Sequence, residues 1–279
     1  RPVVPSAVEI DSKNFKISAN TEQADNTAHN EGPVKYAFDK NPNTIWHSSY
    51  NPMFTVSADN PAEITIDMGK SYTINQFSYL QRPAGGNNGK VQKYNLYVKS
   101  NQADKWKKIV TDGTFADKQE LQKVTFDEVE AQYVKFEVTQ GFGNFATAAE
   151  LAVYQKASDF SKLQEAMDEA EKLERTKYLE VYYSNIDQLC EEAEELLKDF
   201  MTEQAKIDAL TEQLQKALDA LEALAAKSDI KLLEEAVEAA RNIDLDQYKN
   251  TKEFEKALSA SEKLLAEYKK EERILQKDV

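Results

Sequence analysis

Glycine and proline are absent from this chain after Gly143. All eight glycines and all seven prolines lie at or before Gly143 in a sequence of 279 residues. Because these two residues mark most tight turns, their loss predicts nearly continuous helix after that point. Frequent turns are expected before it. The change follows the segment AELAVYQK, which places a domain boundary near Lys156.

Cysteine and histidine are also scarce. The chain has one cysteine, Cys190, and two histidines, which excludes an internal disulfide framework and argues against a zinc site built from thiolates or imidazoles. Cys190 lies in an apolar helical stripe with no basic neighbour, and we interpret it as a small core residue. No run approaches the roughly 18 apolar residues of a membrane span. Arg1 is not followed by an apolar leader segment, so a fragment or a mature product is expected.

Basic residues are too few after residue 156 to balance the acidic ones. The net charge is −14. Residues 1–156 hold 17 basic and 18 acidic side chains, whereas residues 157–279 hold 18 and 31. Such an acidic surface repels nucleic acid and anionic membranes, so neither is expected as a partner. We interpret the excess charge as a solvated face that keeps a monomer soluble.

The first 156 residues alternate in the manner of β-strands. In EITIDMG, the apolar Ile64, Ile66 and Met68 alternate with polar residues, and YNLYVKS, QKVTF and QYVKFEVTQ behave similarly. Turn clusters such as DKNPNT, RPAGGNNGK, TDGTF and GFGNF separate these segments. Short strands between such turns predict an antiparallel β-sandwich of about eight strands over residues 1–156.

Residues 157–279 show helical periodicity. NIDQLCEEAEELLKDF places Ile186, Leu189, Ala193 and Leu197 on one face, as in an amphipathic helix. Residues 163–178 also align with 233–248 at an offset of 70, which indicates an internal repeat. We expect a three-helix bundle over 157–227, with helices at 159–175, 179–198 and 203–226. A second repeat over 228–279 stops at Val279 before its third helix, so a longer protein is expected.

The helical repeats resemble FIVAR modules, which are three-helix bundles of Gram-positive surface proteins and carbohydrate-active enzymes. The resemblance implies a spacer or interaction role and no chemistry, with the tyrosines packed between helices. The residues that carry it are Leu163, Ala166, Ala170, Tyr178, Tyr183 and Ser184 in the first copy, TEQAKIDALTEQLQKALDAL in its last helix, and Leu233, Ala236, Ala240 and Tyr248 in the second copy.

The segment NPNTIWHSSY, residues 41–50, places Trp46, one of two tryptophans, beside His47 on a turn. A catalytic histidine, a metal ligand, a core residue and a ligand-binding residue are all possible there. Alternation alone does not decide whether Trp46 faces the core. The other histidine, His29, lies in an early loop and is expected to be solvated.

Five segments of the first half resemble the discoidin or coagulation-factor type C fold, and more narrowly a family 32 carbohydrate-binding module. They are KISANTEQ, YAFDKNPNTIWHSSY, ITIDMGKSYTINQFSYLQRPAGGNNGKVQKYNLYVKS, ELQKVTFDEVEAQYVKFEVT and GNFATAAELAVY, which occur in the family's order over about 140 residues. The resemblance implies that Trp46 is a core residue. It also implies that His47, Arg82 and an Asn of the NNG turn bind a galactose-type sugar with an axial hydroxyl.

The residue types suit such a site. Neutral imidazole, guanidinium and amide groups bind hydroxyls, and an aromatic ring stacks on a sugar face. Asn88 matches the family position and Asn87 is its neighbour. Phe145 matches the family's stacking ring best, Phe142 lies on the same loop, and Tyr50 is expected as a side wall. For Phe145 and Phe142, an anchor packed on the core is the alternative.

A second group of residues carries side-chain oxygen atoms that could bind a cation. Asp39, Asn41 and Thr44 share one turn, and Glu150 lies near the end of the domain. Calcium takes six to eight oxygen ligands, and the resemblance implies a structural calcium ion at this turn. Asp39, Thr44 and Glu150 match the family pattern, whereas Lys40 replaces its usual glycine and must point away. An Asx-turn without metal is the alternative.

Motifs of the common enzyme classes are missing. The sequence has no G-x-S-x-G, H-E-x-x-H or phosphate-binding loop, so we assign no catalytic residue. We expect a non-catalytic module that binds glycans ending in galactose or N-acetylgalactosamine, within a secreted or cell-wall-attached, glycan-active enzyme. The alternative is an adhesin fragment whose sandwich binds a protein or another cell-surface ligand.

Overall fold

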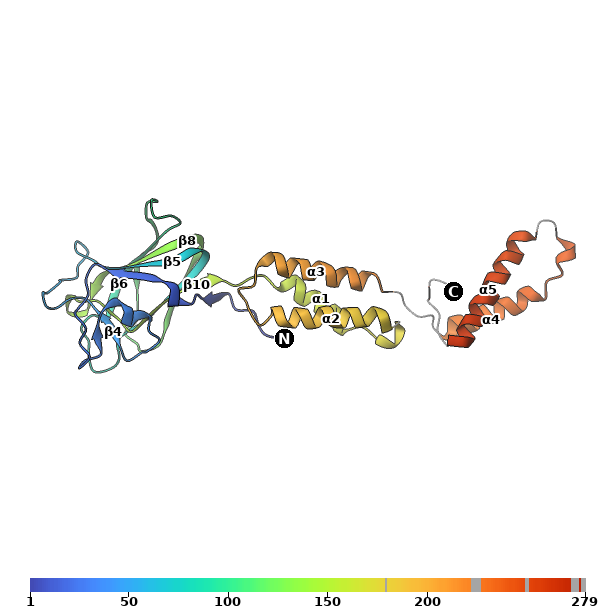
Figure 1. Ribbon diagram of the computed structural model, residues 1–279, viewed down its shortest axis with the longest axis horizontal. Coiled ribbons are helices and arrows are strands. Elements are labelled where there is room, and N and C mark those ends of the chain that lie inside the picture. The colour runs from blue at the N-terminus through green and yellow to red at the C-terminus, as the bar shows by residue number, and fades with distance from the viewer. Residues whose placement is uncertain (179, 222–226, 249–250, 272–275, 277–279) are drawn as a thin grey trace. The chain divides into compact units, whose positions relative to one another are not determined.

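A computed structural model describes the chain except for residues 179, 222–226, 249–250, 272–275 and 277–279. The chain forms two compact units (Figure 1). One contains Val3–Ala157, and the other contains Arg1–Pro2 and Ser158–Val279. Each unit is described by itself below.

The first unit is an antiparallel β-sandwich with ten strands, of which only β3 and β4 pair in parallel. One sheet has the order β1-β10-β5-β8-β6-β7, with β2 paired to β5, and a small sheet has the order β3-β4-β9. The strands are β1 Ala7–Glu9, β2 Lys16–Ala19, β3 Glu31–Gly32, β4 Ile45–His47, β5 Ala62–Leu80, β6 Val91–Lys99, β7 Lys107–Thr114, β8 Gln122–Gly141, β9 Thr147–Ala148 and β10 Glu150–Lys156.

Strands β5 and β8 are long and lie side by side in the larger sheet. Residues 64–67 of β5 pair with β2, and 62–67 pair with 133–138 of β8, whereas 74–80 pair with β10. The pairing of β5 with β8 shifts register between Asp67 and Tyr72, next to Gly69, whose φ is +81°. A bulge and a glycine bend a strand without ending its ladder. QKVTF and QYVKFEVTQ were predicted as separate strands. That prediction was wrong, because both segments lie in the continuous strand β8.

The core confirms the alternating pattern. Ile64, Ile66 and Met68 are buried between the layers. Trp46 has no exposed surface, and its indole Nε1 donates a hydrogen bond to the Thr21 carbonyl oxygen at 3.0 Å. The expectation of a core tryptophan is confirmed, since burial of the ring is combined with a satisfied donor.

The second unit begins with α1 Ser161–Glu171, α2 Glu180–Leu196 and α3 Gln204–Asp219, each packed on the other two. Apolar stripes at the expected spacing are buried, including Leu163 of α1, Ile186 of α2 and Leu214 of α3. Helix α1 is shorter than predicted because the chain turns through a 3-10 segment at Arg175–Lys177. Arg175 holds that turn by a bidentate ion pair to Asp187 of α2.

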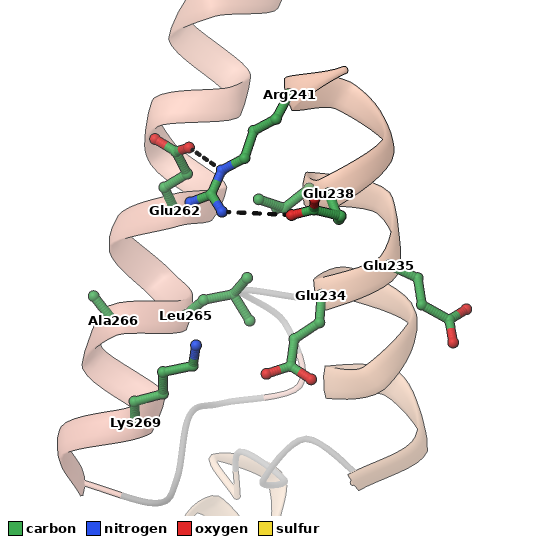
Figure 2. Close-up of a pocket in the computed structure, with 9 residues that line it drawn as sticks. Glu234, Glu235, Glu238, Arg241, Glu262, Leu265, Ala266 and Lys269 are labelled. Atoms are coloured by element: carbon green, nitrogen blue, oxygen red, sulfur yellow. Dashed lines mark hydrogen bonds and ion pairs between the residues drawn. The ribbon is translucent and has the colours of Figure 1, made fainter. Parts of the chain in front are cut away.

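Helices α4 Lys227–Arg241 and α5 Lys252–Glu271 pack as a hairpin. Figure 2 shows the groove between them, where Arg241 of α4 pairs with Glu262 of α5 and with Glu238. Tyr248 is 64% exposed, so its predicted packing between helices was wrong within the described residues. Cys190 of α2 is half-buried, and burial raises the pKa of its thiol. The division of this unit at residue 227 stays a prediction.

Candidate functional site

The candidate site lies where strand β4 ends beside three loops. His47 is the last residue of β4, and Arg82 lies two residues after Leu80, the last residue of β5. The loop that contains Asn88 precedes β6, and Phe145 precedes β9. Backbone hydrogen bonds join these loops: Gly89 N donates to the Phe142 oxygen, and Thr147 N donates to the Gly89 oxygen, both at 2.8 Å. Pairing of this kind fixes loop positions on a rigid scaffold.

The imidazole of His47 has a defined tautomer. Its Nδ1 lies 2.6 Å from the carbonyl oxygen of Ser48, which can only accept, so Nδ1 carries the proton. Nε2 of the neutral ring is therefore an acceptor. His47 is 3% exposed. Burial lowers the pKa of His47, and the charge of Arg82 adds to this, whereas the Ser48 carbonyl and Glu31 act in the opposite direction.

The guanidinium of Arg82 is anchored at one end. Its Nη1 donates to the Asn88 carbonyl oxygen at 2.7 Å, while its Nε is buried and has no hydrogen-bond partner among the described residues. A Cβ atom at Gly86 would lie 2.5 Å from Nη2 of Arg82, so the loop folds closely around the guanidinium. Asn88 and Asn87 are both exposed. A Cβ at Gly143 would lie 2.7 Å from the Asn88 amide oxygen, which brings the Asn88 and Phe142–Asn144 loops together.

Two aromatic rings flank His47. The Phe145 ring centroid lies 5.4 Å from that of His47 at a tilt of 58°, and the Tyr50 centroid lies 5.2 Å away, edge-on at 88°. Phe145 is half-buried, and Phe142 is 47% exposed on the neighbouring turn. The structure thus brings His47, Arg82, Phe145 and Tyr50 together and leaves Phe142 at the rim.

Some contacts of this site have no signal in the sequence. The Tyr50 hydroxyl donates to Glu31 Oε1 at 2.8 Å and accepts from the Asn26 amide at 3.2 Å. Ser48 holds the opposite loop, because Ala146 N donates to its Oγ at 3.0 Å. These partners lie far apart along the chain, and only folding brings them to the site. His29 is exposed.

The predicted metal turn has a compact geometry. The Asp39 carboxylate accepts hydrogen bonds from the backbone N–H of Asn41 at 2.8 Å and from the Thr44 hydroxyl at 2.7 Å. The Asn41 side-chain oxygen accepts from Asn43 N at 3.2 Å. Lys40 has a φ of +62°, the left-handed conformation that favours glycine. Its ammonium pairs with Glu9. This turn alone would satisfy the Asx-turn alternative.

Glu150 is the feature that an Asx-turn does not explain. Its Oε1 is buried and has no hydrogen-bond partner in the described part of the chain. Burial raises the pKa of Glu150 to about 7, and the negative charge of Asp39 contributes next. Two carboxylates that repel each other, one of them with an orphaned oxygen, suit a bound cation. Within the described residues no cluster of three acidic, His or Cys ligands is present, so a cation would also need backbone carbonyl oxygens.

The grooves of the helical unit are weaker candidates for a ligand-binding site. The α4–α5 groove of about 460 Å³ has Val237 and Leu265 at its base, and its arginine is already ion-paired. No convergent set of hydroxyl-binding groups and aromatic rings lies among its lining residues. Within the described residues, no helix is both long and apolar enough to cross a membrane.

Comparison with known proteins supports the fold. Residues 16–151 match the family model of the F5/8 type C domain. An A type blood N-acetyl-alpha-D-galactosamine deacetylase from Flavonifractor plautii is 36% identical over 125 residues, which is 44% of this chain and 15% of the relative. A Micromonospora viridifaciens sialidase is 27% identical over 143 residues, 50% of this chain and 21% of the relative. The chain thus spans a small part of these relatives.

Solved structures are also similar. The Clostridium perfringens module CpGH89CBM32-5, in complex with GalNAc-beta-1,3-galactose, is 38% identical, with a TM-score of 0.46 over 52% of this chain and 99% of the module. The family 32 module of C. perfringens NanJ, in complex with galactose, is 29% identical, with a TM-score of 0.45 over 53% of this chain and 99% of the module. The match to the family model shows that this chain carries an F5/8 type C domain over residues 16–151, followed by a helical region.

Proposed function

We propose that the sandwich is a non-catalytic carbohydrate-binding module for glycans that end in galactose or N-acetylgalactosamine. The observation that carries the proposal is that a neutral hydrogen-bond acceptor, the His47 imidazole, lies near a cationic donor, the Arg82 guanidinium. His47 Nε2 can accept from a hydroxyl, and Arg82 lies near enough to influence the pKa of His47. An axial hydroxyl between them would donate to Nε2 and accept from the guanidinium.

The aromatic rings support the same ligand class. Phe145 stands beside His47 as an apolar wall for the C–H face of a pyranose, and Tyr50 closes the other side with its hydroxyl held by Glu31. In this proposal the Asn88 amide, with Asn87 beside it, reaches a neighbouring hydroxyl, and Phe142 contacts a second sugar at the rim. Two similar modules were solved with ligands that contain galactose.

A structural calcium ion belongs to the proposal. Asp39, Thr44 and Glu150 would hold it together with backbone oxygens of the turn, and Asn41 would shape that turn through its bond to Asn43. The ion would supply positive charge where Asp39 and Glu150 repel each other. Lys40 is held by Glu9.

We further propose that the helical repeats are FIVAR-like spacers, and that the full protein is a secreted or wall-attached, glycan-active enzyme. The similarity to a deacetylase and a sialidase motivates this proposal for the full protein. An adhesin is the second candidate, because Met53 and Phe142 are 63% and 47% exposed on loops. Exposed apolar side chains of this kind also occur at protein-binding surfaces.

Calorimetric titration of galactose and N-acetylgalactosamine tests the proposal. His47→Ala and Arg82→Ala should each weaken binding by about tenfold or more, or about 1.4 kcal/mol, because a bound hydroxyl is left unpaired. His29→Ala is the matched control, since His29 is exposed and outside the site. Wild-type binding that survives both site substitutions would place the site elsewhere. Binding of a protein ligand without any sugar binding would favour the adhesin.

A further inference from the structure

Thr147 is a buried polar residue that the candidate site has not yet used. It has no exposed surface, and its Oγ1 has no hydrogen-bond partner among the residues that the structure describes. A buried hydroxyl without a partner has lost the hydrogen bonds that water gives it in the unfolded chain, so it destabilises the fold. A valine of the same shape would avoid that cost, so the hydroxyl calls for an explanation.

The strand register places Thr147 beside His47. The two residues are directly opposite each other in the antiparallel β4–β9 pair. Ser48 N donates to the Ala146 carbonyl oxygen at 2.8 Å, so the next pair along, His47 with Thr147, is a non-hydrogen-bonded pair. Side chains approach most closely in such pairs and lie on the same face of the sheet.

The methyl group of Thr147 has its own neighbour. A Cβ atom added to Gly89 would lie 2.4 Å from Thr147 Cγ2, so the absence of a side chain at Gly89 makes room for this methyl. Thr147 N also donates to the Gly89 carbonyl oxygen at 2.8 Å. Methyl and backbone therefore fix the side chain against the loop that follows Asn88.

A second orphaned polar atom lies on the same loop. Arg82 Nε is buried and has no hydrogen-bond partner in the part of the chain that the structure describes, and Arg82 Nη1 donates to the carbonyl oxygen of Asn88, the residue before Gly89. Arg82 Nε is a donor and Thr147 Oγ1 is a donor or an acceptor. A single O–H group between them would accept from Nε and donate to Oγ1.

We propose that Thr147 is a further residue of the sugar site, whose hydroxyl pairs with an O–H group that Arg82 Nε also binds. The inference rests on the proposed sugar-binding function. The O–H group belongs either to the sugar or to a water molecule that supports Arg82. In both cases Thr147 aligns the guanidinium for the ligand, so it acts as a positioning residue for Arg82 and, in the first case, as a direct contact.

The test compares Thr147→Val with Thr147→Ser in the full chain, by calorimetric titration with methyl β-galactoside and by thermal unfolding. Thr147→Val should weaken binding by about tenfold, equal to about 1.4 kcal/mol, while the unfolding temperature of the ligand-free protein stays equal or rises. Thr147→Ser should retain the wild-type affinity because it keeps the hydroxyl. Thr65→Val is the matched control. Thr65 of β5 pairs with Lys135 of β8, away from His47, and its replacement should leave affinity unchanged.

Monodeoxygalactosides identify the source of the O–H group. If it belongs to the sugar, the affinity difference between wild type and Thr147→Val disappears for the one deoxygalactoside that lacks it. If it belongs to water, the difference is the same for every deoxygalactoside. Equal binding of methyl β-galactoside by wild type and Thr147→Val would overturn the role of Thr147 and leave the sugar site intact. A wild type that binds no galactoside would overturn both.

Discussion

At the residue scale, the central feature is the protonation state of His47. Its ring is fixed as the Nδ1–H tautomer by Ser48, and burial lowers its pKa. An ordinary histidine with a pKa of about 6.5 would lose its acceptor in mildly acidic solution. His47 should keep it to lower pH.

Galactoside affinity should therefore fall in acidic solution with a midpoint below pH 6.5. The sign for stability follows from the same shift: protonation favours the unfolded chain, so sandwich stability should decline as pH falls from the unfolded value of about 6.5 through the lower folded pKa. Titrations at a series of pH values measure the first effect. A midpoint of the affinity loss at or above pH 6.5 would contradict it.

The calcium proposal makes a crossing prediction for Glu150→Gln. Without calcium, at pH 8, the wild-type carboxylate is ionised above its pKa of about 7 and repels Asp39. The amide removes that repulsion, so the variant should melt at a higher temperature than wild type in chelator. With calcium the order should reverse, because a ligand to the ion is lost. If added calcium changes neither melting temperature, the turn is an Asx-turn without metal.

At the element scale, the loops around β9 depend on glycine. Gly89 has a φ of +86° and leaves no space for a Cβ beside Thr147, whereas Gly85 has a φ of +100° and nothing within 4 Å. Gly85→Ala should cost only the left-handed backbone strain, about 1–2 kcal/mol. Gly89→Ala should cost more and weaken galactoside binding. Urea unfolding and titration of both variants check this. Equal losses of stability would show that the close packing at Gly89 contributes nothing.

The sequence predicted some elements better than others. Alternation identified Ile64, Ile66 and Met68 as core because a strand with one buried face has a period of two. The sandwich has ten strands where eight or so were expected, because strands such as β3 and β9 are too short to show alternation. The continuation of β5 through Asp67 and Tyr72 depends on its pairing with β8, which a sequence pattern does not reveal. The end of α1 at Glu171 was also missed, because the 3-10 turn that follows at Arg175–Lys177 is held by an ion pair to Asp187 of α2, a contact that helical periodicity does not reveal.

The site was predictable only in part. Residue types could not single out His47 among its four possible roles, and resemblance to a family supplied the roles of His47, Arg82 and Phe145. The Ser48 carbonyl, the Glu31 carboxylate and the Thr147 hydroxyl escaped notice because a sequence pattern does not reveal cross-strand neighbours or hydrogen-bond partners.

At the scale of the whole molecule, the two units have different surfaces. The sandwich carries the hydroxyl-binding groups, whereas the helical unit carries most of the negative charge, with 31 acidic against 18 basic residues over 157–279. Such an excess of like charge is typical of a solvated surface.

Removal of residues 158–279 should therefore leave galactoside affinity unchanged within about twofold. The sandwich has its own core and hydrogen-bonded sheets, so it should fold alone. Titration of the truncated and the full chain makes the comparison. A loss of more than about tenfold, equal to about 1.4 kcal/mol, would mean that the helical region contributes to the site.

The most direct test of the sugar site is a nitrogen NMR spectrum of the two imidazole rings during titration with galactose. Only His29 and His47 contribute, and the exposed His29 serves as an internal reference. We predict that His47 is neutral with its proton on Nδ1, and that galactose shifts the His47 Nε2 signal while Nδ1 and His29 stay in place. Saturating galactose that leaves His47 Nε2 unmoved, or a His47 proton found on Nε2, would contradict the account.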